Sequence, residues 1–310
     1  MKAFILGAGL GTRLRPLTEE RPKPLVPVLG RPLIYSILDR IYGAGIRDVA
    51  INTHHRAEVY KKFFPDESYD GQKIAFFYEP EVLETGGGIK NLEAWTGEDS
   101  LLVHNGDIYT DLDLRKIVEE HRKSGNAVTM VLRSEGDAQH VTRDMNSGLV
   151  VDIRGMLGRK DSEKQEKEEA FLFTGIYVVE PVVRTFMQTG EKVSIISVFL
   201  EMMRQGLRIG GLVMDEGEWF DLGTREEYLR LQMEMLEETD GNFIVASAVV
   251  EPGAVVEQSV LGPGVVVEAG SACRRSVLWD NAVIRAGAVL EDCVVREGKM
   301  VEQSARGVDI

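Results

Sequence analysis

An internal repeat near the end of the 310-residue chain constrains its fold more than any other feature. Three stretches follow one another at a spacing of 17 residues: VVEPGAVVEQSVLGPGV from Val249, VVEAGSACRRSVLWDNA from Val266 and VIRAGAVLEDCVVREGK from Val283. Small, β-branched and glycine residues at this near-hexapeptide period are typical of a parallel β-helix, in which each coil stacks on the one before. A small β-sandwich would not require so regular a repeat, so we expect residues 241–310 to form a short β-helix.

Before residue 240 the chain alternates short apolar strands with amphipathic helices. Strands are predicted over 3–6, 48–52, 74–78, 101–104, 127–132, 148–153, 171–179 and 207–214, and helices over 33–41, 57–64, 114–121 and 195–203. This alternation indicates an α/β fold with a mostly parallel sheet covered on both faces. Ligands on such sheets bind beyond the carboxyl ends of the strands. The charged run over 159–169 is predicted to be an exposed, mobile loop.

A glycine-rich turn, Gly7-Ala8-Gly9-Leu10-Gly11-Thr12, follows the first strand. Glycines allow close backbone approach and unusual φ angles, so successive N–H groups of such a loop can converge on an anion. Four cations follow within a short span, at Arg13, Arg15, Arg21 and Lys23. Because the whole chain carries a net charge of −14, this local basic cluster indicates a bound polyphosphate.

Two common phosphate-binding loops do not fit this turn. The Walker pattern requires a lysine after its last glycine, and none follows Gly11; the dinucleotide pattern requires glycine where Thr12 stands. A nicotinamide dehydrogenase is therefore disfavoured. The plainer alternative to a phosphate site is a glycine-rich turn with a solvated basic face.

The strand over 101–104 ends in Asn105-Gly106-Asp107. An aspartate at the carboxyl end of a buried parallel strand points towards the ligand crevice. Mg²⁺ prefers one or two carboxylates together with phosphate oxygens, so Asp107 and a polyphosphate can form a magnesium site. The nearby Asp111 and Asp113 are better explained as residues at a helix start.

Two further segments are candidates for ligand contact. Three glycines in Glu84-Thr85-Gly86-Gly87-Gly88-Ile89 precede a short predicted helix and leave room for a flat ligand, although a flexible helix start would explain them too. In Trp219-Phe220-Asp221-Leu222-Gly223-Thr224, a second aspartate precedes a helix, which Thr224 and Glu227 would open as a capping box. Asp221 could equally be a turn residue at a strand end.

The pattern G-A-G-x-G-T-R-x-x-P-x-T followed by P-K-P resembles the signature of the sugar-1-phosphate nucleotidylyltransferases, or NDP-sugar pyrophosphorylases. The resemblance covers nearly the whole chain. It implies a Rossmann-like nucleotidyltransferase domain over 1–240 and a C-terminal left-handed β-helix over 241–310. The chain is similar to two branches of this family. Segment 84–89 resembles the enzymes that make UDP-N-acetylmuramic acid, and the β-helix tail resembles those that make GDP-mannose or related GDP-sugars. The tail also resembles that of bacterial enzymes that act on glucose 1-phosphate.

The resemblance implies that an NTP, UTP or GTP, reacts with a sugar 1-phosphate to give an NDP-sugar and pyrophosphate, with Mg²⁺ as cofactor. Because the sugar phosphate is already ionised at neutral pH, catalysis would rest on positioning and charge stabilisation. Arg13 would neutralise the leaving pyrophosphate, Lys23 would hold the attacking phosphate and the α-phosphate, and Asp107 and Asp221 would hold Mg²⁺. Arg13 and Lys23 thereby contact the nucleotide, and the remaining implied contacts are Leu6, Ala8, Gly9, Gly11, Thr12 and Gly86 for the nucleotide, and Asn105, Gly148 and Thr174 for the sugar phosphate.

The composition agrees with an enzyme that works in solution. Hydrophobic residues make up 44% of the chain and charged residues 28%, as in globular proteins. No apolar run approaches the ~18 residues of a spanning helix, and because a strand is predicted from Ala3 onwards we expect no signal peptide. Cys273 and Cys293 show neither metal-ligand nor disulfide spacing, which fits a reducing cytoplasm. The acidic balance argues against nucleic-acid binding, so the expected partners are small molecules and, through the β-helix, a second copy of the chain.

Two other classes stay open. A non-catalytic regulatory or assembly subunit, as found among relatives of these enzymes, should lose the arginine, the lysine or a metal-binding aspartate, and this chain keeps all four. A bifunctional enzyme with acyltransferase activity in the tail would need more coils and a histidine in the repeat. Neither the nucleobase nor the sugar follows from the sequence, and we expect sugar choice to depend on 159–169.

Overall fold

The structure is a computed structural model that describes residues 1–158, 167–237, 239 and 241–310. Two units of the chain are distinguished by their internal packing. The first consists of Met1–Leu10 and Ser36–Trp219, and the second of Gly11–Tyr35 and Phe220–Ile310. The expected functional division at residue 240 stays a prediction.

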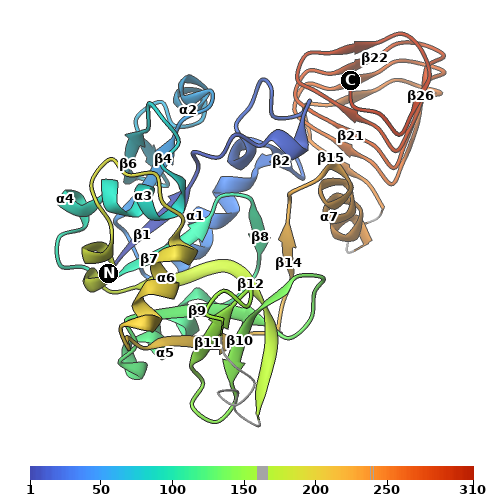
Figure 1. Cartoon of the computed structure of the whole chain (residues 1–310). Coiled ribbons are helices and arrows are strands. Elements are labelled where there is room, and N and C mark those ends of the chain that lie inside the picture. Colours follow the sequence, from blue (N-terminus) through green and yellow to red (C-terminus); the bar gives the residue numbers. More distant parts are fainter. Residues whose placement is uncertain (159–166, 238, 240) are drawn as a thin grey trace. The chain divides into compact units, whose positions relative to one another are not determined.

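One ten-stranded sheet forms the centre of the first unit (Figure 1). Its strands lie in the order β11 (Val150–Ile153), β10 (Gln139–Asp144), β12 (Glu168–Val179), β7 (Leu101–Asn105), β1 (Lys2–Leu6), β4 (Val49–Thr53), β6 (Gln72–Tyr78) and β5 (Ser68–Tyr69), and β9 (Val128–Arg133) joins β12 to β13 (Ile209–Val213). β7, β1, β4 and β6 are parallel, while β12, β10 and β11 are antiparallel to their neighbours. The predicted α/β fold with a mostly parallel core is therefore confirmed.

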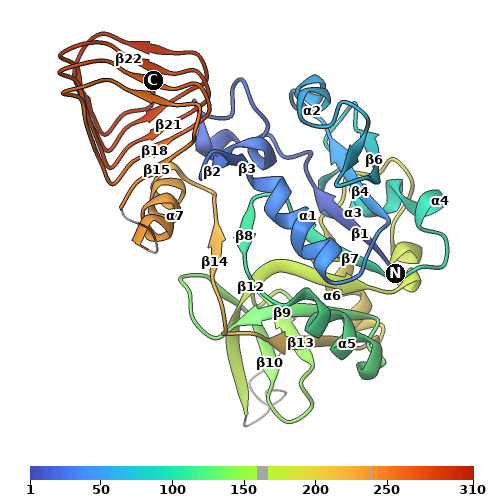
Figure 2. The ribbon, with the colours of Figure 1, turned by 180° about the vertical axis from the view of Figure 1, so that it is seen from behind.

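Helices cover both faces of this sheet. They are α1 (Leu33–Gly43), α2 (Ala57–Phe63), α3 (Glu84–Asn91), α4 (Glu93–Thr96), α5 (Leu114–Ser124) and α6 (Ile195–Arg204). α6 lies on the face seen in Figure 1 and α5 on the face seen in Figure 2. Apolar residues of the strands and helices, such as Phe4, Val103, Tyr177 and Phe199, are fully buried in one core.

Two boundaries differ from the sequence prediction. The three glycines of segment 84–89 lie inside α3, which begins at Glu84, rather than ahead of a helix. Most of the charged run, residues 159–166, lies outside the described residues, and its end is not a loop, because Glu168 and Glu169 already belong to β12. β11, which falls within the strand predicted over 148–153, lies at the end of the strand order.

Most of the second unit is the predicted parallel β-helix, built from three four-stranded sheets. The sheets contain β15 (Phe243–Ile244), β18 (Val260–Leu261), β21 (Val277–Leu278) and β24 (Val294–Val295); β16 (Val249–Val250), β19 (Val266–Val267), β22 (Val283–Ile284) and β25 (Met300–Val301); and β17 (Val255–Glu257), β20 (Ala272–Arg274), β23 (Val289–Glu291) and β26 (Ala305–Arg306). Val249 pairs with Val266, Val266 with Val283 and Val283 with Met300, so one coil equals one repeat.

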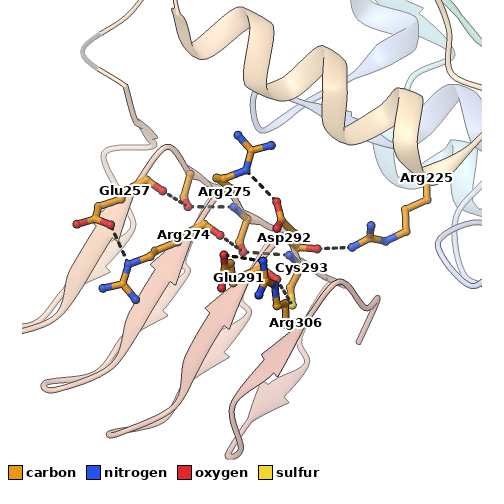
Figure 3. A network of polar contacts seen from close by, with 10 residues as sticks. Arg225, Glu257, Arg274, Arg275, Glu291, Asp292, Cys293 and Arg306 are labelled. Carbon is orange, nitrogen blue, oxygen red and sulfur yellow. Dashed lines mark hydrogen bonds and ion pairs between the residues drawn. The ribbon is translucent and has the colours of Figure 1, made fainter.

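The inside of the β-helix explains the recurring serine of the repeat. Ser259, Ser276 and Cys293 occupy the same buried position in successive coils. The Ser259 hydroxyl accepts a hydrogen bond from the Ser276 N–H at 3.1 Å, and the Ser276 hydroxyl accepts one from the Cys293 N–H, also at 3.1 Å. Outside, ion pairs such as Arg274 with Glu257 join neighbouring coils (Figure 3). The ladder and the pairs both bind each coil to the next.

The rest of the second unit packs on this β-helix. It comprises the short helices η1 (Thr12–Leu14) and η2 (Lys23–Leu25), the hairpin of β2 (Pro27–Val28) and β3 (Arg31–Pro32), and α7 (Arg225–Glu237), which β14 (Trp219–Asp221) leads into. Within the described part of the chain, no helix is both long and apolar enough to cross a membrane.

Candidate active site

The carboxyl ends of β1 and β7 meet in the first unit. Leu6 pairs with Asn105, and the N–H of Gly106 donates to the carbonyl of Leu6 at 3.0 Å. The start of the glycine loop and the Asn105-Gly106-Asp107 turn therefore leave the sheet side by side. Asp107 is partly exposed at this edge.

A buried network that sequence reasoning missed holds the start of the glycine loop. The Asn52 carboxamide oxygen accepts hydrogen bonds from the N–H groups of Gly7 (2.7 Å) and Ala8 (3.3 Å). Its nitrogen donates to Glu79 Oε1 at 2.7 Å, and Glu79 Oε2 accepts from the N–H of Leu83 at 3.0 Å. Asn52 and Glu79 thus join the glycine loop to the segment ahead of α3. The only sequence signal was a polar residue at each of two strand ends.

Gly7 is a glycine for a packing reason. A Cβ on Gly7 would lie 2.6 Å from the carbonyl oxygen of Asn52 and 2.7 Å from the hydroxyl of Tyr60. Tyr60 itself donates a hydrogen bond to the Gly7 carbonyl at 3.3 Å. The loop therefore lies directly against β4 and α2, where no larger residue fits without a shift.

The glycines of α3 also pack against protein. A Cβ on Gly86 would lie 2.9 Å from the carbonyl of Val193, and one on Gly88 would lie 3.1 Å from Asn52 Nδ2 and 3.2 Å from Glu79 Oε1. We expected these glycines to leave room for a flat ligand. On the side where a side chain would project, that expectation is wrong, because protein atoms already occupy the space. Contact between Gly86 and a nucleotide stays a prediction.

Two of the three residues assigned to the sugar phosphate come together. Gly175, next to Thr174, has a φ of 77°, and a Cβ there would lie 2.6 Å from the side-chain nitrogen of Asn105. The hydroxyl of Thr174 is fully buried and donates to the carbonyl of Val131 at 2.9 Å. Gly148 lies apart in the turn between β10 and β11, where its N–H donates to Asp144. Their contacts with a sugar stay predictions.

His104, one residue before Asn105, is a buried neutral group. Burial lowers the pKa of its imidazole to about 4, against the opposing effects of the Asn105 carbonyl and the Asp107 charge. Its Nδ1 lies 2.8 Å from the Asn105 carbonyl, and its Nε2 has no hydrogen-bond partner among the residues that the structure describes. The site edge therefore contains an uncharged imidazole at neutral pH.

Three of the four predicted catalytic residues lie close together in the second unit. Lys23 Nζ is 3.8 Å from Asp221 Oδ1. The Arg13 guanidinium lies against Gly223, where a Cβ would be 3.1 Å from its Nη1. Thr224 caps α7 by accepting the N–H of Glu227 at 3.3 Å. The short turn between β14 and α7 thus contains both Asp221, which lies beside Lys23, and Gly223, which contacts the Arg13 guanidinium.

The four-cation cluster is divided, which corrects the expectation that all four serve one polyphosphate. Arg13 and Arg15 are exposed. Arg21 is buried and forms an ion pair with Glu297 of the β-helix at 2.5 Å. A cation used inside the protein in this way is not directed at a phosphate.

The carboxylates fit the predicted magnesium ion by their chemistry. Oxygen ligands from one or two carboxylates, completed by phosphate oxygens, are what Mg²⁺ prefers. The side chain of Asp221 is 44% exposed and so accessible to a bound ion. Asp107 belongs to the first unit and Asp221 to the second, so their joint action on one metal stays a prediction.

The first unit presents the start of a glycine loop and an aspartate at one edge of its sheet, and the second unit brings a lysine, an arginine and a second aspartate close together. Each set of groups is typical of enzymes that act on nucleotides. The chain belongs to the nucleotidyl transferase family, whose model matches residues 2–238. Residues 233–310 match a second family, described as GlmU-like, C-terminal hexapeptide.

Two curated relatives illustrate the similarity. A UTP–glucose-1-phosphate uridylyltransferase of Synechocystis is 29% identical over 270 residues, which cover 82% of this chain and 68% of the relative. A mannose-1-phosphate guanylyltransferase of Mycobacterium tuberculosis is 34% identical over 233 residues, or 74% of this chain and 62% of the relative. The match to the second relative thus spans less than two thirds of its length.

A solved structure supports the fold. A Bacillus anthracis protein, described as a candidate glucose-1-phosphate thymidylyltransferase and crystallised with sucrose, superposes with a TM-score of 0.64. It covers 77% of this chain and 96% of its own, at 21% sequence identity. The similarity therefore extends over most of the α/β part.

Proposed function

We propose that this chain transfers a nucleotidyl group from UTP or GTP to a sugar 1-phosphate, giving an NDP-sugar and pyrophosphate with the help of Mg²⁺. The proposal rests mainly on one observation: Lys23 Nζ lies 3.8 Å from Asp221 Oδ1, and the Arg13 guanidinium lies against nearby Gly223. In a member of this family, these are the charges that the reaction needs. The two curated relatives, named for UTP with glucose 1-phosphate and for a guanylyl group with mannose 1-phosphate, support a choice between UTP and GTP.

The reaction requires the protein mainly to orient the substrates and to place charged groups around the phosphates. An oxygen of the sugar phosphate attacks the α-phosphorus, the bond from that phosphorus to the bridging oxygen breaks, and pyrophosphate leaves with the electron pair. The attacking oxygen is already ionised, so no general base is needed. Catalysis then comes from orientation and from stabilisation of charge in the transition state.

Each residue has a specific role in this proposal. Lys23 holds the attacking phosphate and the α-phosphate, and Arg13, which is exposed, neutralises the leaving pyrophosphate. Asp107 and Asp221 would hold Mg²⁺, which when bound supplies positive charge to the phosphate oxygens. Asn52, by fixing the backbone of Gly7 and Ala8, orients the loop that contacts the nucleotide.

The substrates can be identified by one panel of assays. Pyrophosphate release is measured with Mg²⁺ while four NTPs are crossed with the 1-phosphates of glucose, mannose, N-acetylglucosamine, N-acetylmuramate and heptose. We expect release with UTP or GTP and one of the sugars, its loss on addition of EDTA, and its return with excess Mg²⁺. Release that EDTA leaves unchanged would contradict the metal assignment.

Single substitutions test the roles. Removal of one preorganised charge typically lowers the rate by ~10²–10³. We therefore expect losses of at least this size in kcat for Arg13→Ala, Lys23→Ala, Asp107→Asn and Asp221→Asn, with the far-UV circular dichroism of the wild type. Arg122→Ala, an exposed arginine on α5, is the matched control and should keep wild-type turnover. A variant of the first four that kept wild-type kcat would refute the role of that residue.

A further inference from the structure

We propose that the β-helix holds Lys23 and Asp221 in place relative to each other, through two positioning residues, Arg21 and Arg225, that its last coils bind. The catalytic importance of this arrangement rests on the function proposed above. Arg21 lies two residues before Lys23, and Arg225 lies four residues after Asp221. Because these connections are short, fixing the two arginines restricts the two predicted catalytic side chains.

Arg21 is fixed by three groups of the β-helix. Its Nη2 lies 2.5 Å from Glu297 Oε2 and 3.9 Å from Asp280 Oδ2. Its guanidinium stacks over the indole of Trp279, 5.0 Å from the ring centroid. The Arg21 side chain is only 4% exposed, and the tail provides two carboxylates and an aromatic ring to its guanidinium.

Arg225, at the start of α7, is fixed by a second set. Its Nε donates to Asp309 Oδ1 at 2.6 Å, and its Nη2 donates to the backbone carbonyl of Asp292. Figure 3 shows this side chain reaching from α7 to Asp292. Asp309 is almost fully buried, with 6% of its side chain exposed. Because Arg225 is bound by one carboxylate and one backbone carbonyl, its side chain has few alternative arrangements.

Hydrogen bonds between the two anchors complete the connection. The Tyr228 hydroxyl, on α7, donates to the carbonyl of Pro27 at 2.6 Å and accepts from Trp279 Nε1 at 3.0 Å. The Gln232 carboxamide donates to the same Pro27 carbonyl and accepts from the N–H of Leu29. Thus α7, the segment after Lys23 and the β-helix share one buried network.

The kinetic test uses Arg21→Gln and Arg225→Gln, which remove the charge and keep much of the side-chain length. A displacement of about 1 Å in a reacting group can lower the rate on the order of 10²-fold, so we expect kcat to fall by this order. Glu257→Gln is the matched control, because it breaks an ion pair on the exposed surface of the β-helix in which the carboxylate pairs with Arg274, at 2.8 Å, rather than with either anchor. It should keep wild-type kcat.

A second readout does not depend on the substrates. Lys23 is 8% exposed, so its amine should react slowly with an acylating reagent in the wild type. Mass spectrometry of the labelled peptide should show faster acylation of Lys23 in both anchor variants and no change in Glu257→Gln. If Arg21→Gln does not fold, Arg21→Lys replaces it, since it keeps the charge but loses the planar fork.

The outcomes separate the two proposals. Folded anchor variants that keep wild-type kcat and wild-type Lys23 reactivity would overturn the positioning role and leave the enzyme activity in place. Faster acylation of Lys23 in the anchor variants alone would support positioning, even if no substrate of the panel were turned over. Absence of turnover in the wild type would instead contradict the proposed function.

Discussion

Individual residues at the site are selected by their neighbours as much as by a ligand. Gly7 and Gly88 both face Asn52, and Gly223 faces the Arg13 guanidinium. Asn52 in turn uses both ends of its carboxamide, one for the glycine loop and one for Glu79. The precise chemistry of these positions therefore depends on contacts between segments that are distant in the sequence.

Gly223→Ala should lower activity without unfolding the protein. The new Cβ would stand 3.1–3.2 Å from three guanidinium atoms of Arg13, so the flexible end of that side chain must move away. We expect kcat to fall ~10-fold or more while the thermal midpoint stays within a few degrees, because Gly223 does not need a positive φ. Gly43→Ala, where a Cβ meets nothing within 4 Å, is the control. Equal kcat for the two variants would show that catalysis does not depend on the position of the Arg13 guanidinium against Gly223.

His104 should make the protein less stable in acid. Burial lowers the pKa of its imidazole from 6.5 to about 4, so between these values the unfolded chain binds a proton that the folded chain does not. Its contribution is therefore complete above pH 6.5 and is lost as the pH falls towards 4, to a total of about 3 kcal/mol. The free energy of unfolding, measured by urea titration from pH 7 to pH 4, should fall less steeply in His104→Gln. Parallel curves would contradict the assignment.

At the scale of elements, the repeat was the most informative part of the sequence. Its 17-residue period predicted stacked coils and equals the offset between paired strands such as Val249 with Val266 and Val266 with Val283, although the last pair, Leu290 with Ala305, departs from this offset. The positions of β1, β4 and β7 followed from short apolar runs. By contrast, the glycines of α3 were misplaced, since Gly86 and Gly88 are determined by Val193 and by Asn52, and no local pattern reports such contacts.

The same limit applies to the candidate site. Arg13, Lys23, Asp107 and Asp221 could be selected from motifs, whereas the Asn52–Glu79 network and the burial of Arg21 could not. Arg21 meets Glu297, 276 residues further along the chain, and the sequence around Arg21 looks the same whether its partner is a phosphate or a carboxylate. Only a three-dimensional arrangement distinguishes the two.

The packing of the β-helix predicts unreactive cysteines. Cys273 and Cys293 are free and fully buried, and burial raises the pKa of the Cys273 thiol to about 12. Because the thiolate is the reactive form, iodoacetamide at pH 8 should label neither residue in the folded protein and both in 6 M guanidinium. Peptide mass spectrometry reads the labelling, with the urea-unfolded chain as a second control. Rapid labelling of Cys273 under native conditions would mean that the coils open easily.

At the scale of the whole molecule, the predicted catalytic and binding residues come from both units. Leu6, Ala8, Gly9, Asn105 and Asp107 belong to the first, and Arg13, Lys23 and Asp221 to the second. The second unit also contains the β-helix, so the tail and three of the four charged residues form one packed body. Under the proposals above, this arrangement connects the tail to the predicted catalytic residues, in addition to the self-association that we expect from the sequence.

The most direct test of the account follows the atoms of the reaction. The substrate pair that releases pyrophosphate fastest is used again, with a sugar 1-phosphate in which the three non-bridging oxygens are ¹⁸O, and the products are analysed by mass spectrometry and ³¹P NMR. If the sugar phosphate attacks the α-phosphorus, the NDP-sugar carries all of the label and the pyrophosphate carries none. NMP together with unreacted, fully labelled sugar phosphate would contradict the account, because water rather than the sugar phosphate would then attack the α-phosphorus.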